Sequence, residues 1–245
     1  MWWSNLFSGT SPASFFNFSF FPKYGTVFLQ GICYTLLLAV VSVLLAIIPA
    51  LLLAVMRLSK NKFIKGISGA YIALFRSTPL LVQLSIIYFG LFGVIQIPRV
   101  VIFGFIDLSR FIPGVVALAL NSSAYVAEIF RAGILAVDIG QTEASRSLGL
   151  TQFDTLQLVV LPQAIKNVLP ALANEIVTMV KESSICSTLG MVELMFAAKT
   201  VATSTYITLG PYMLAAAVYF CINFPASKAI EAIERRMRRG DRHSH

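Results

Sequence analysis

Long apolar segments constrain this chain more than any other feature of its sequence. The first extends over residues 26–56 and contains no charged residue. A helix of about 20 apolar residues is long enough to cross the hydrocarbon core of a bilayer. Only 12% of all residues are charged and 57% are hydrophobic, whereas soluble domains have about 25% charged residues. We therefore predict an all-α membrane protein.

Four further apolar segments bring the predicted number of transmembrane helices to five. The spans are expected at about 26–56, 67–95, 111–137, 164–191 and 209–233. The second span contains a polar island at residues 76–79. Segment 192–208 is only moderately apolar and contains Glu193 and Lys199. We interpret it as a short external or re-entrant helix, because a sixth span would place the basic C-terminal tail outside the cell.

The distribution of Lys and Arg predicts the orientation of the chain. Basic loops remain in the cytoplasm. With five spans, most basic residues fall on one side: Arg57, Lys60, Lys62, Lys65, Arg146, Lys166, Arg235, Arg236, Arg238, Arg239 and Arg242. The other side has Lys23, Arg99, Arg110 and Lys199. The N-terminus is therefore expected outside and the C-terminus in the cytoplasm.

The same pattern suggests three regions in the chain. Residues 1–22 are rich in Trp and Phe, which favour the membrane interface, and we interpret them as an aromatic interfacial lead-in. Residues 23–236 form the predicted transmembrane domain. Residues 237–245 are expected to be a basic cytoplasmic tail.

A polar segment, 143–162, lies between the third and fourth spans on the predicted cytoplasmic side. Thr142 is a candidate N-cap for a helix that begins at Glu143. Glu143 and Arg146 are spaced to pair on one helix face. Gly149 is expected to mark a break or a close approach to a partner. Pro162 is expected to fix a turn before the fourth span.

This segment resembles the EAA loop of ABC-importer permeases. It begins with Glu143 and Ala144, has Gly149 at the family's spacing and ends with Leu161 and Pro162. Ser145 and Val159 stand where the family has Ala and Ile. Further blocks at 31–36, 75–84, 121–134 and 181–184 resemble permeases of the polar amino-acid uptake family, the histidine, glutamine and arginine type.

The resemblance implies a permease of the type I ABC-importer fold in the bacterial inner membrane. Its expected partners are two ATP-binding subunits, a second permease subunit that is identical or paralogous, and an extracytoplasmic amino-acid-binding protein. Glu143, Ala144, Gly149, Leu161 and Pro162 are implied to couple the permease to the ATPase.

ATP and Mg²⁺ would bind the partner ATPase, because this sequence has no GxxxxGK[ST] motif. We expect no catalytic residue, no cofactor and no metal on this chain itself.

Polar residues inside the predicted spans are the candidates for substrate binding. A charged residue at mid-span costs about 2.5–3.5 kcal/mol on insertion scales and usually faces a cavity or a partner. Glu175 is the first candidate, as a ligand for the ammonium or cationic side chain of an amino acid. Asn121, Ser122 and Tyr125 are the second candidates, and Thr78 is the third. The alternative for each is a hydrogen bond or ion pair between helices.

Five other charged residues in or near the spans are interpreted as structural: Arg76, Glu128, Arg131, Lys181 and Glu182. Glu128 and Arg131 are three residues apart on one predicted helix, so we expect them to pair.

Other functions remain as alternatives to an importer of polar amino acids. The same machinery could carry an opine, a peptide or another small solute, and the chain could instead be a receptor or scaffold without transport activity. An intramembrane enzyme is disfavoured because the predicted spans contain no His. The net charge of +8 does not favour nucleic acid, because the basic residues lie at the ends of apolar segments. The sequence does not identify the amino acid.

Overall fold

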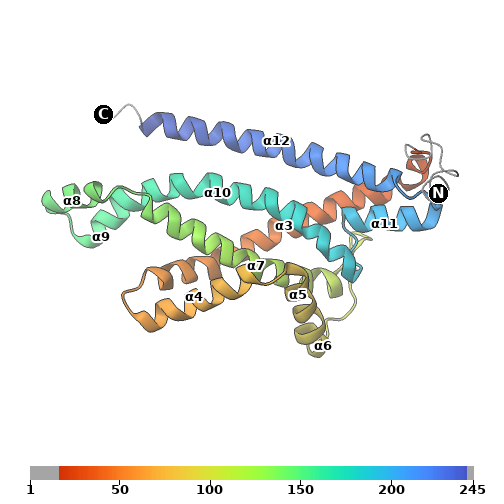
Figure 1. Ribbon diagram of the computed structural model, residues 1–245, viewed down its shortest axis with the longest axis horizontal. Coiled ribbons are helices and arrows are strands. Elements are labelled where there is room, and N and C mark those ends of the chain that lie inside the picture. The colour runs from red at the N-terminus through yellow and green to blue at the C-terminus, as the bar shows by residue number, and fades with distance from the viewer. Residues whose placement is uncertain (1–16, 242–245) are drawn as a thin grey trace, which may run out of the picture.

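The computed structural model describes residues 17–241, and these are mostly helical (Figure 1). The elements, in chain order, are α3 (Phe21–Leu58), α4 (Lys62–Ser77), α5 (Leu80–Ser85), a π-helix (Ile86–Leu91), α6 (Phe92–Val94), β1 (Val101–Ile102), β2 (Ile106–Asp107), α7 (Leu108–Leu135), α8 (Ile139–Ser147), α9 (Gln152–Thr155), a second π-helix (Leu156–Val160), α10 (Leu161–Glu182), a 3₁₀ helix (Ser183–Leu189), α11 (Leu194–Thr205) and α12 (Gly210–Asp241).

The long helices confirm the five predicted spans. Four helices are long and apolar enough to cross a membrane: Phe21–Leu58, Leu108–Leu135, Gln152–Leu189 and Gly210–Met237. The second span in chain order is a bent pair, Lys62–Ser77 and Leu80–Val94, whose axes meet at 105°, and counting this pair as one span brings the number to five. The membrane orientation that we infer from the basic residues remains a prediction.

The bend in the second span falls at the predicted polar island. Thr78 has an extended backbone, with φ −111° and ψ 146°, as is usual for a residue before proline. Pro79 then precedes the first turn of α5. The sequence predicted one span with a polar interruption, and the structure shows that the interruption turns the chain sharply.

Small side chains allow α3 and α7 to pack closely at the centre of the protein. The two helices have the most extensive contact of any pair of elements. On α3, Ala39, Ala46 and Ala50 have no exposed surface, and on α7 the same is true of Ala117 and Ala124. Two helices approach closely where their contact residues are small. This central pair supports the helices that surround it.

The predicted external helix is α11, which is 12 residues long and is not among the candidate spans. Glu193 is fully buried at its N-terminus and accepts hydrogen bonds from the backbone N–H groups of Met195 and Phe196, at 2.8 and 2.6 Å. The hydroxyl of Tyr219 on α12 donates to the same carboxylate at 2.9 Å. Gly31 on α3 lies against the backbone of Leu194. Glu193 therefore joins α11 to α12.

Different elements lie at the two ends of the molecule along its long axis (Figure 1). The α3–α4 turn, α8, α9 and the C-terminal end of α12 lie at one end, and the start of α3, α11 and the start of α12 lie at the other. Residues 1–16 of the predicted lead-in lie outside the described residues, and Phe20 is buried against Phe28. Of the predicted tail, residues up to Asp241 continue α12.

Candidate functional site

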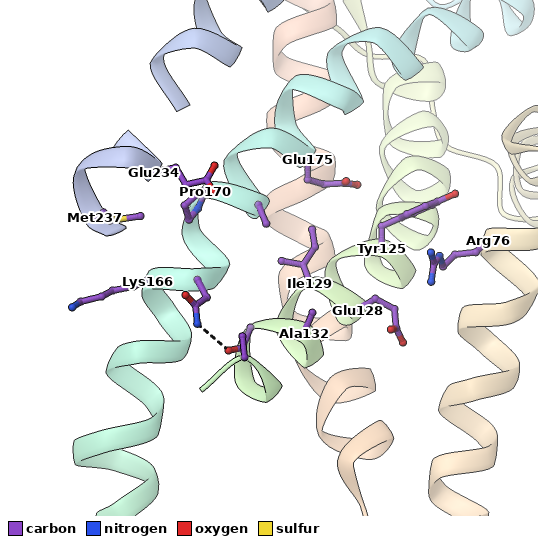
Figure 2. Close-up of a pocket in the computed structure, with 14 residues that line it drawn as sticks. Arg76, Tyr125, Glu128, Ile129, Ala132, Lys166, Pro170, Glu175, Glu234 and Met237 are labelled. Carbon is purple, nitrogen blue, oxygen red and sulfur yellow. Dashed lines mark hydrogen bonds between the residues drawn. The ribbon is translucent and has the colours of Figure 1, made fainter. Parts of the chain in front are cut away.

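A cavity of about 520 Å³ lies between four helices, α4, α7, α10 and α12. Figure 2 shows the side chains that line it. Its charged residues are Arg76 from α4, Glu128 from α7, Lys166 and Glu175 from α10, and Glu234 from α12. Two of the predicted substrate residues, Tyr125 on α7 and Glu175 on α10, therefore line the same cavity. They come from segments 50 residues apart in the chain.

The carboxylate of Glu175 is held in place by Ser122, which is another of the predicted substrate residues. Glu175 is 9% exposed, and its Oε1 accepts a hydrogen bond from the hydroxyl of Ser122 at 2.8 Å. Ser122 itself is fully buried and does not line the cavity. Ser122 thus positions the carboxylate, and Glu175 presents it to the cavity.

Arg76 lines the same cavity. The sequence analysis instead predicts a structural role for this residue. Arg76 is the last arginine of α4, directly before the bend at Thr78. Its guanidinium carbon lies 5.5 Å from the centre of the Tyr125 ring, a distance typical of a cation–π contact. Figure 2 shows Arg76 and Glu175 reaching toward Tyr125 from different helices. The cavity therefore offers one cation and one carboxylate around an aromatic ring.

Glu128 differs from Glu175 because it is already paired with cations. Its Oε2 accepts from Nη2 and Nε of Arg131, at 2.8 and 3.0 Å, which confirms the predicted pair. Its Oε1 also lies 4.0 Å from Nε of Arg57 on α3. The charge of Glu128 is thus largely satisfied within the protein and is less available to a ligand.

The remaining predicted substrate residues, Asn121 and Thr78, lie in a separate network. Gln83 connects them: its Oε1 accepts from Asn121 Nδ2 at 2.7 Å, and its Nε2 donates to Thr78 Oγ1 at 2.8 Å. Gln83 Nε2 also donates to the carbonyls of Phe75 and Thr78. Neither Asn121 nor Thr78 lines the charged cavity. In this structure they join the bent second span to α7.

Sequence reasoning did not assign a role to Gln83. Its only signal was an uncharged polar residue within the second apolar segment. The network satisfies carbonyls that the break at Pro79 removes from helical hydrogen bonding.

α7 and α10 approach each other closely at Gly133, one of the residues that line the cavity. A Cβ atom added at Gly133 would overlap the side chain of Val168, so only glycine allows this approach. The side-chain amide of Asn167 donates a hydrogen bond to the carbonyl of Gly133 at 3.5 Å. Lys166, Glu234 and Met237 also line the cavity, and Figure 2 shows them on the side opposite Arg76.

The helix predicted near Glu143 exists but begins earlier than expected. α8 begins at Ile139, and Asp138 is its N-cap, accepting from the N–H of Gly140 at 2.6 Å. The prediction of Thr142 as N-cap was wrong, because Asp138 is also a good capping residue and lies one turn nearer α7. Glu143 and Ala144 are exposed on α8. Arg146 donates to the carbonyl of Leu150 at 3.3 Å.

Gly149 ends α8, as the sequence predicted. Its φ is +86°, a conformation that is costly for other residues. Thr151 then begins α9 with a capping box that it forms with Asp154. The hydroxyl of Ser145 lies 3.2 Å from that of Thr155, and both residues are buried. These contacts fix α8 and α9 to each other as one rigid unit.

Pro162 does not form the predicted turn. The second π-helix, Leu156–Val160, continues directly into α10, and Pro162 lies in the first turn of α10. Proline has no N–H to donate, so an α-helix would lose one hydrogen bond here. A π-helical turn is one way in which a helix accommodates such a defect. α9 is therefore joined through the π-helix to α10 without a hinge at Pro162.

The segment of residues 139–160, which contains α8 and α9, exposes large apolar side chains to which the sequence analysis gives no role. Leu148 is 85% exposed, Ile139 is 74% exposed and Phe153 is 69% exposed. They lie within ten residues of the exposed Glu143 and Ala144 in the chain. Large apolar side chains that are exposed together often mark a protein contact.

Comparisons with known proteins agree with this geometry. The family described as "Binding-protein-dependent transport system inner membrane component" matches residues 42–239. A protein of Rickettsia typhi named as a glutamine transport system permease is 38% identical over 218 residues, which cover 89% of this chain and 95% of that protein. The arginine transport system permease protein of Bacillus subtilis is 38% identical over 213 residues, covering 87% of this chain and 93% of that one.

A solved structure is similar over almost the same length. It is a crystal structure of an amino acid ABC transporter with histidines, with 44% identity and a TM-score of 0.80, covering 90% of this chain and 98% of that chain. The candidate spans, the family match and these similarities agree. The chain belongs to the family of binding-protein-dependent transport system inner membrane components.

Proposed function

We propose that this chain forms the translocation path of an ATP-driven importer for polar amino acids. The observation that carries the proposal is the charged cavity, in which Glu175 and Arg76 face a common space beside Tyr125. An amino acid has an ammonium and a carboxylate. Charge-assisted hydrogen bonds to a carboxylate and a guanidinium would recognise these two groups at once. The similar proteins named for glutamine and arginine transport support this substrate class.

Glu175 is the proposed ligand of the ammonium or of a cationic side chain. Ser122 orients its carboxylate. Arg76 is the proposed partner of the substrate carboxylate, and Tyr125 is the proposed wall between the two groups. Asn121 and Thr78 are proposed to contribute indirectly, by holding the bent span that carries Arg76.

The charge of the cavity predicts which cargo is accepted. Uptake should be measured in proteoliposomes with labelled glutamine, arginine, aspartate and an opine. Glutamine or arginine should be transported, and aspartate should be excluded because its second carboxylate would meet Glu175. Efficient aspartate uptake would contradict the assignment of Glu175. Exclusive opine uptake would favour the same machinery with another cargo.

The energy is proposed to come from two ATP-binding subunits, with ATP and Mg²⁺ bound there. The exposed residues Glu143 and Ala144 of α8 are the proposed contact, together with the exposed apolar residues Leu148 at the end of α8 and Phe153 on α9. Gly149 ends the docking helix, and Leu161 and Pro162 continue into α10, which carries Glu175. A displacement of α8 would pass to α9 through the contact between Ser145 and Thr155, and from α9 it would reach the cavity along the continuous helix Gln152–Leu189.

The coupling role is tested by comparing Glu143→Lys with Lys199→Glu, a charge reversal on α11 at the other end of the molecule. Glu143→Lys should lower substrate-stimulated ATP hydrolysis while the complex still assembles. Lys199→Glu should leave it unchanged. Normal stimulation in Glu143→Lys would contradict the proposed contact.

A second permease subunit and an extracytoplasmic amino-acid-binding protein complete the proposed assembly. Whether the second permease is an identical copy can be measured by the mass of the purified complex.

A further inference from the structure

Three lysines are clustered where the chain turns from α3 to α4. Lys60, Lys62 and Lys65 are all exposed. Among residues 17–237, whose side chains the structure describes, no acidic side chain lies within ion-pair distance of them. The sequence explains part of this, because no Asp or Glu precedes Asp107 in the whole chain. The turn is therefore a concentrated positive charge without an internal counter-charge.

The neighbouring Arg57 is not part of this cluster. Its Nε lies 4.0 Å from Oε1 of Glu128, and its guanidinium lies beside Gly69 on α4. Arg57 is thus directed into the protein, toward α7. Arg57 therefore has an acidic partner within the protein, whereas the three lysines are available to an external anion.

Apolar side chains are interleaved with the lysines. Phe63 is 76% exposed, and Ile67 on the same helix is 49% exposed. The other face of α4 is fixed to the protein, since Ser68 donates to the carbonyl of Leu53 at 2.7 Å and Tyr71 donates to the carbonyl of Leu120 at 2.9 Å. The first turns of α4 therefore present lysines and large apolar residues together, on a firmly attached helix.

We propose that the α3–α4 turn binds the headgroup of an acidic phospholipid. Lys60, Lys62 and Lys65 contact its phosphate, and an acyl chain lies against Phe63 and Ile67. Basic clusters directly beyond a transmembrane helix attract anionic lipids of the cytoplasmic leaflet. This assignment rests on the proposed orientation of the chain, and it is independent of which amino acid is carried.

A lipid fits this surface better than a soluble partner does. The lysines border exposed apolar residues on both flanking helices, Leu58 at 39% and Phe63 at 76%, which is the arrangement expected at a membrane boundary. The segment proposed to meet the ATPase is different, because α8 carries an exposed acid, Glu143, next to its apolar residues. The lysine cluster and α8 lie at the same end of the molecule (Figure 1).

The test measures which lipids remain bound to the purified complex by native mass spectrometry. The complex is first equilibrated with equal amounts of phosphatidylglycerol and phosphatidylcholine. The wild type should retain phosphatidylglycerol preferentially, and this preference should fall as salt is raised. The variant Lys60→Gln/Lys62→Gln/Lys65→Gln should lower retention by at least about tenfold. Inorganic phosphate at the same concentration should not displace the lipid.

The matched control removes three positive charges from the other end of the molecule: Lys23→Gln/Arg99→Gln/Lys199→Gln. It should keep the wild-type lipid preference. The proposal is overturned if the lysine variant keeps that preference, or if the wild type shows none at low salt. It is also overturned if the lysine variant loses the ATPase subunit while phosphatidylglycerol retention is unchanged, which would assign the cluster to a protein contact.

Discussion

At the scale of single residues, Glu175 and Glu128 show how similar side chains acquire different roles. Both line the same cavity. Glu128 is bonded to Arg131 and lies near Arg57, whereas Glu175 accepts a hydrogen bond from the neutral hydroxyl of Ser122. A carboxylate without a cation in its own protein is the better ligand for a cationic group. This difference decides which acid we assign to the substrate.

The assignment predicts a specific loss in Glu175→Gln. Uptake efficiency should fall by about 10- to 100-fold, because a hydrogen bond to a charged group contributes about 1.5–3 kcal/mol. Glutamine keeps the size of the side chain and can still accept from Ser122. The control is Glu231→Gln, an exposed acid of α12 that is not part of the charged cavity. Equal uptake by the two variants would remove Glu175 from the substrate site.

Gly149 gives a second prediction at this scale. Gly149→Ala should destabilise the end of α8 by about 1–2 kcal/mol, the typical cost of a left-handed conformation for a residue with a Cβ. An added Cβ at this position meets no atom within 4 Å, so the cost is conformational. Gly66→Ala is the control, since Gly66 has equally open surroundings but lies within α4. Thermal unfolding of both variants should show a loss for Gly149→Ala only.

At the scale of elements, the buried Glu193 makes the packing of α11 sensitive to pH. Burial raises the pKa of Glu193 from 4.5 to about 7, although hydrogen bonds from Met195, Phe196 and Tyr219 oppose this rise. Between pH 4.5 and 7 the folded protein keeps a proton that the unfolded chain has released. The contribution of this group to stability is therefore complete below pH 4.5 and is lost as pH rises through about 7.

The predicted loss of stability with rising pH can be measured by comparing the wild type with Glu193→Gln. The midpoint of thermal unfolding of the purified complex should be recorded between pH 4.5 and 8. The difference between the two proteins should change in favour of the variant as pH rises, because glutamine has no proton to release. A difference that is constant across this range would show that Glu193 does not titrate there.

The elements also show what the sequence could predict. Apolar length identified the five spans, because a bilayer imposes that length on any helix that crosses it. It placed the interruption at residues 76–79 but not the angle of 105°. The N-cap of α8 was misassigned because Asp138 and Thr142 are both suitable caps. The contact between Gln83 and Asn121 joins residues 38 apart, and local patterns do not reveal such pairs.

The candidate site was predicted only in part for the same reason. Glu175, Ser122 and Tyr125 stood out as polar residues within apolar helices, where they are costly. Arg76 stood out equally, but its direction depends on the bend that follows it. The exposed Leu148 and Phe153 carried no signal, since apolar residues are common everywhere in this chain.

At the scale of the whole molecule, the proposed orientation in the membrane decides which end of the protein faces the proposed ATP-binding subunits and which end faces the proposed binding protein. The proposed topology places α8 and the α3–α4 turn in the cytoplasm and the β1–β2 hairpin outside. The hairpin tip, Phe103, is 83% exposed. Asp107 at its base pairs with Arg99 at 3.2 Å and caps α7 through Ser109. Hydrogen bonds from Ser109 hold the pKa of Asp107 below its usual value.

Cysteine labelling tests this orientation. In a variant with Cys33, Cys186 and Cys221 replaced by serine, Phe103→Cys should react with a membrane-impermeant maleimide in intact cells. Lys60→Cys should react only after the membrane is opened. The reverse pattern would invert the topology and place the coupling segment out of reach of a cytoplasmic ATPase.

The most direct measurement of the central claim is accumulation of labelled amino acids in proteoliposomes. The vesicles would contain this chain with its ATP-binding subunits, a second permease if one is required, and the binding protein. We predict accumulation of glutamine or arginine against a gradient when ATP is present, and no accumulation without ATP. If an assembled complex hydrolyses ATP but accumulates no amino acid, the proposed cargo and the role of the charged cavity are contradicted.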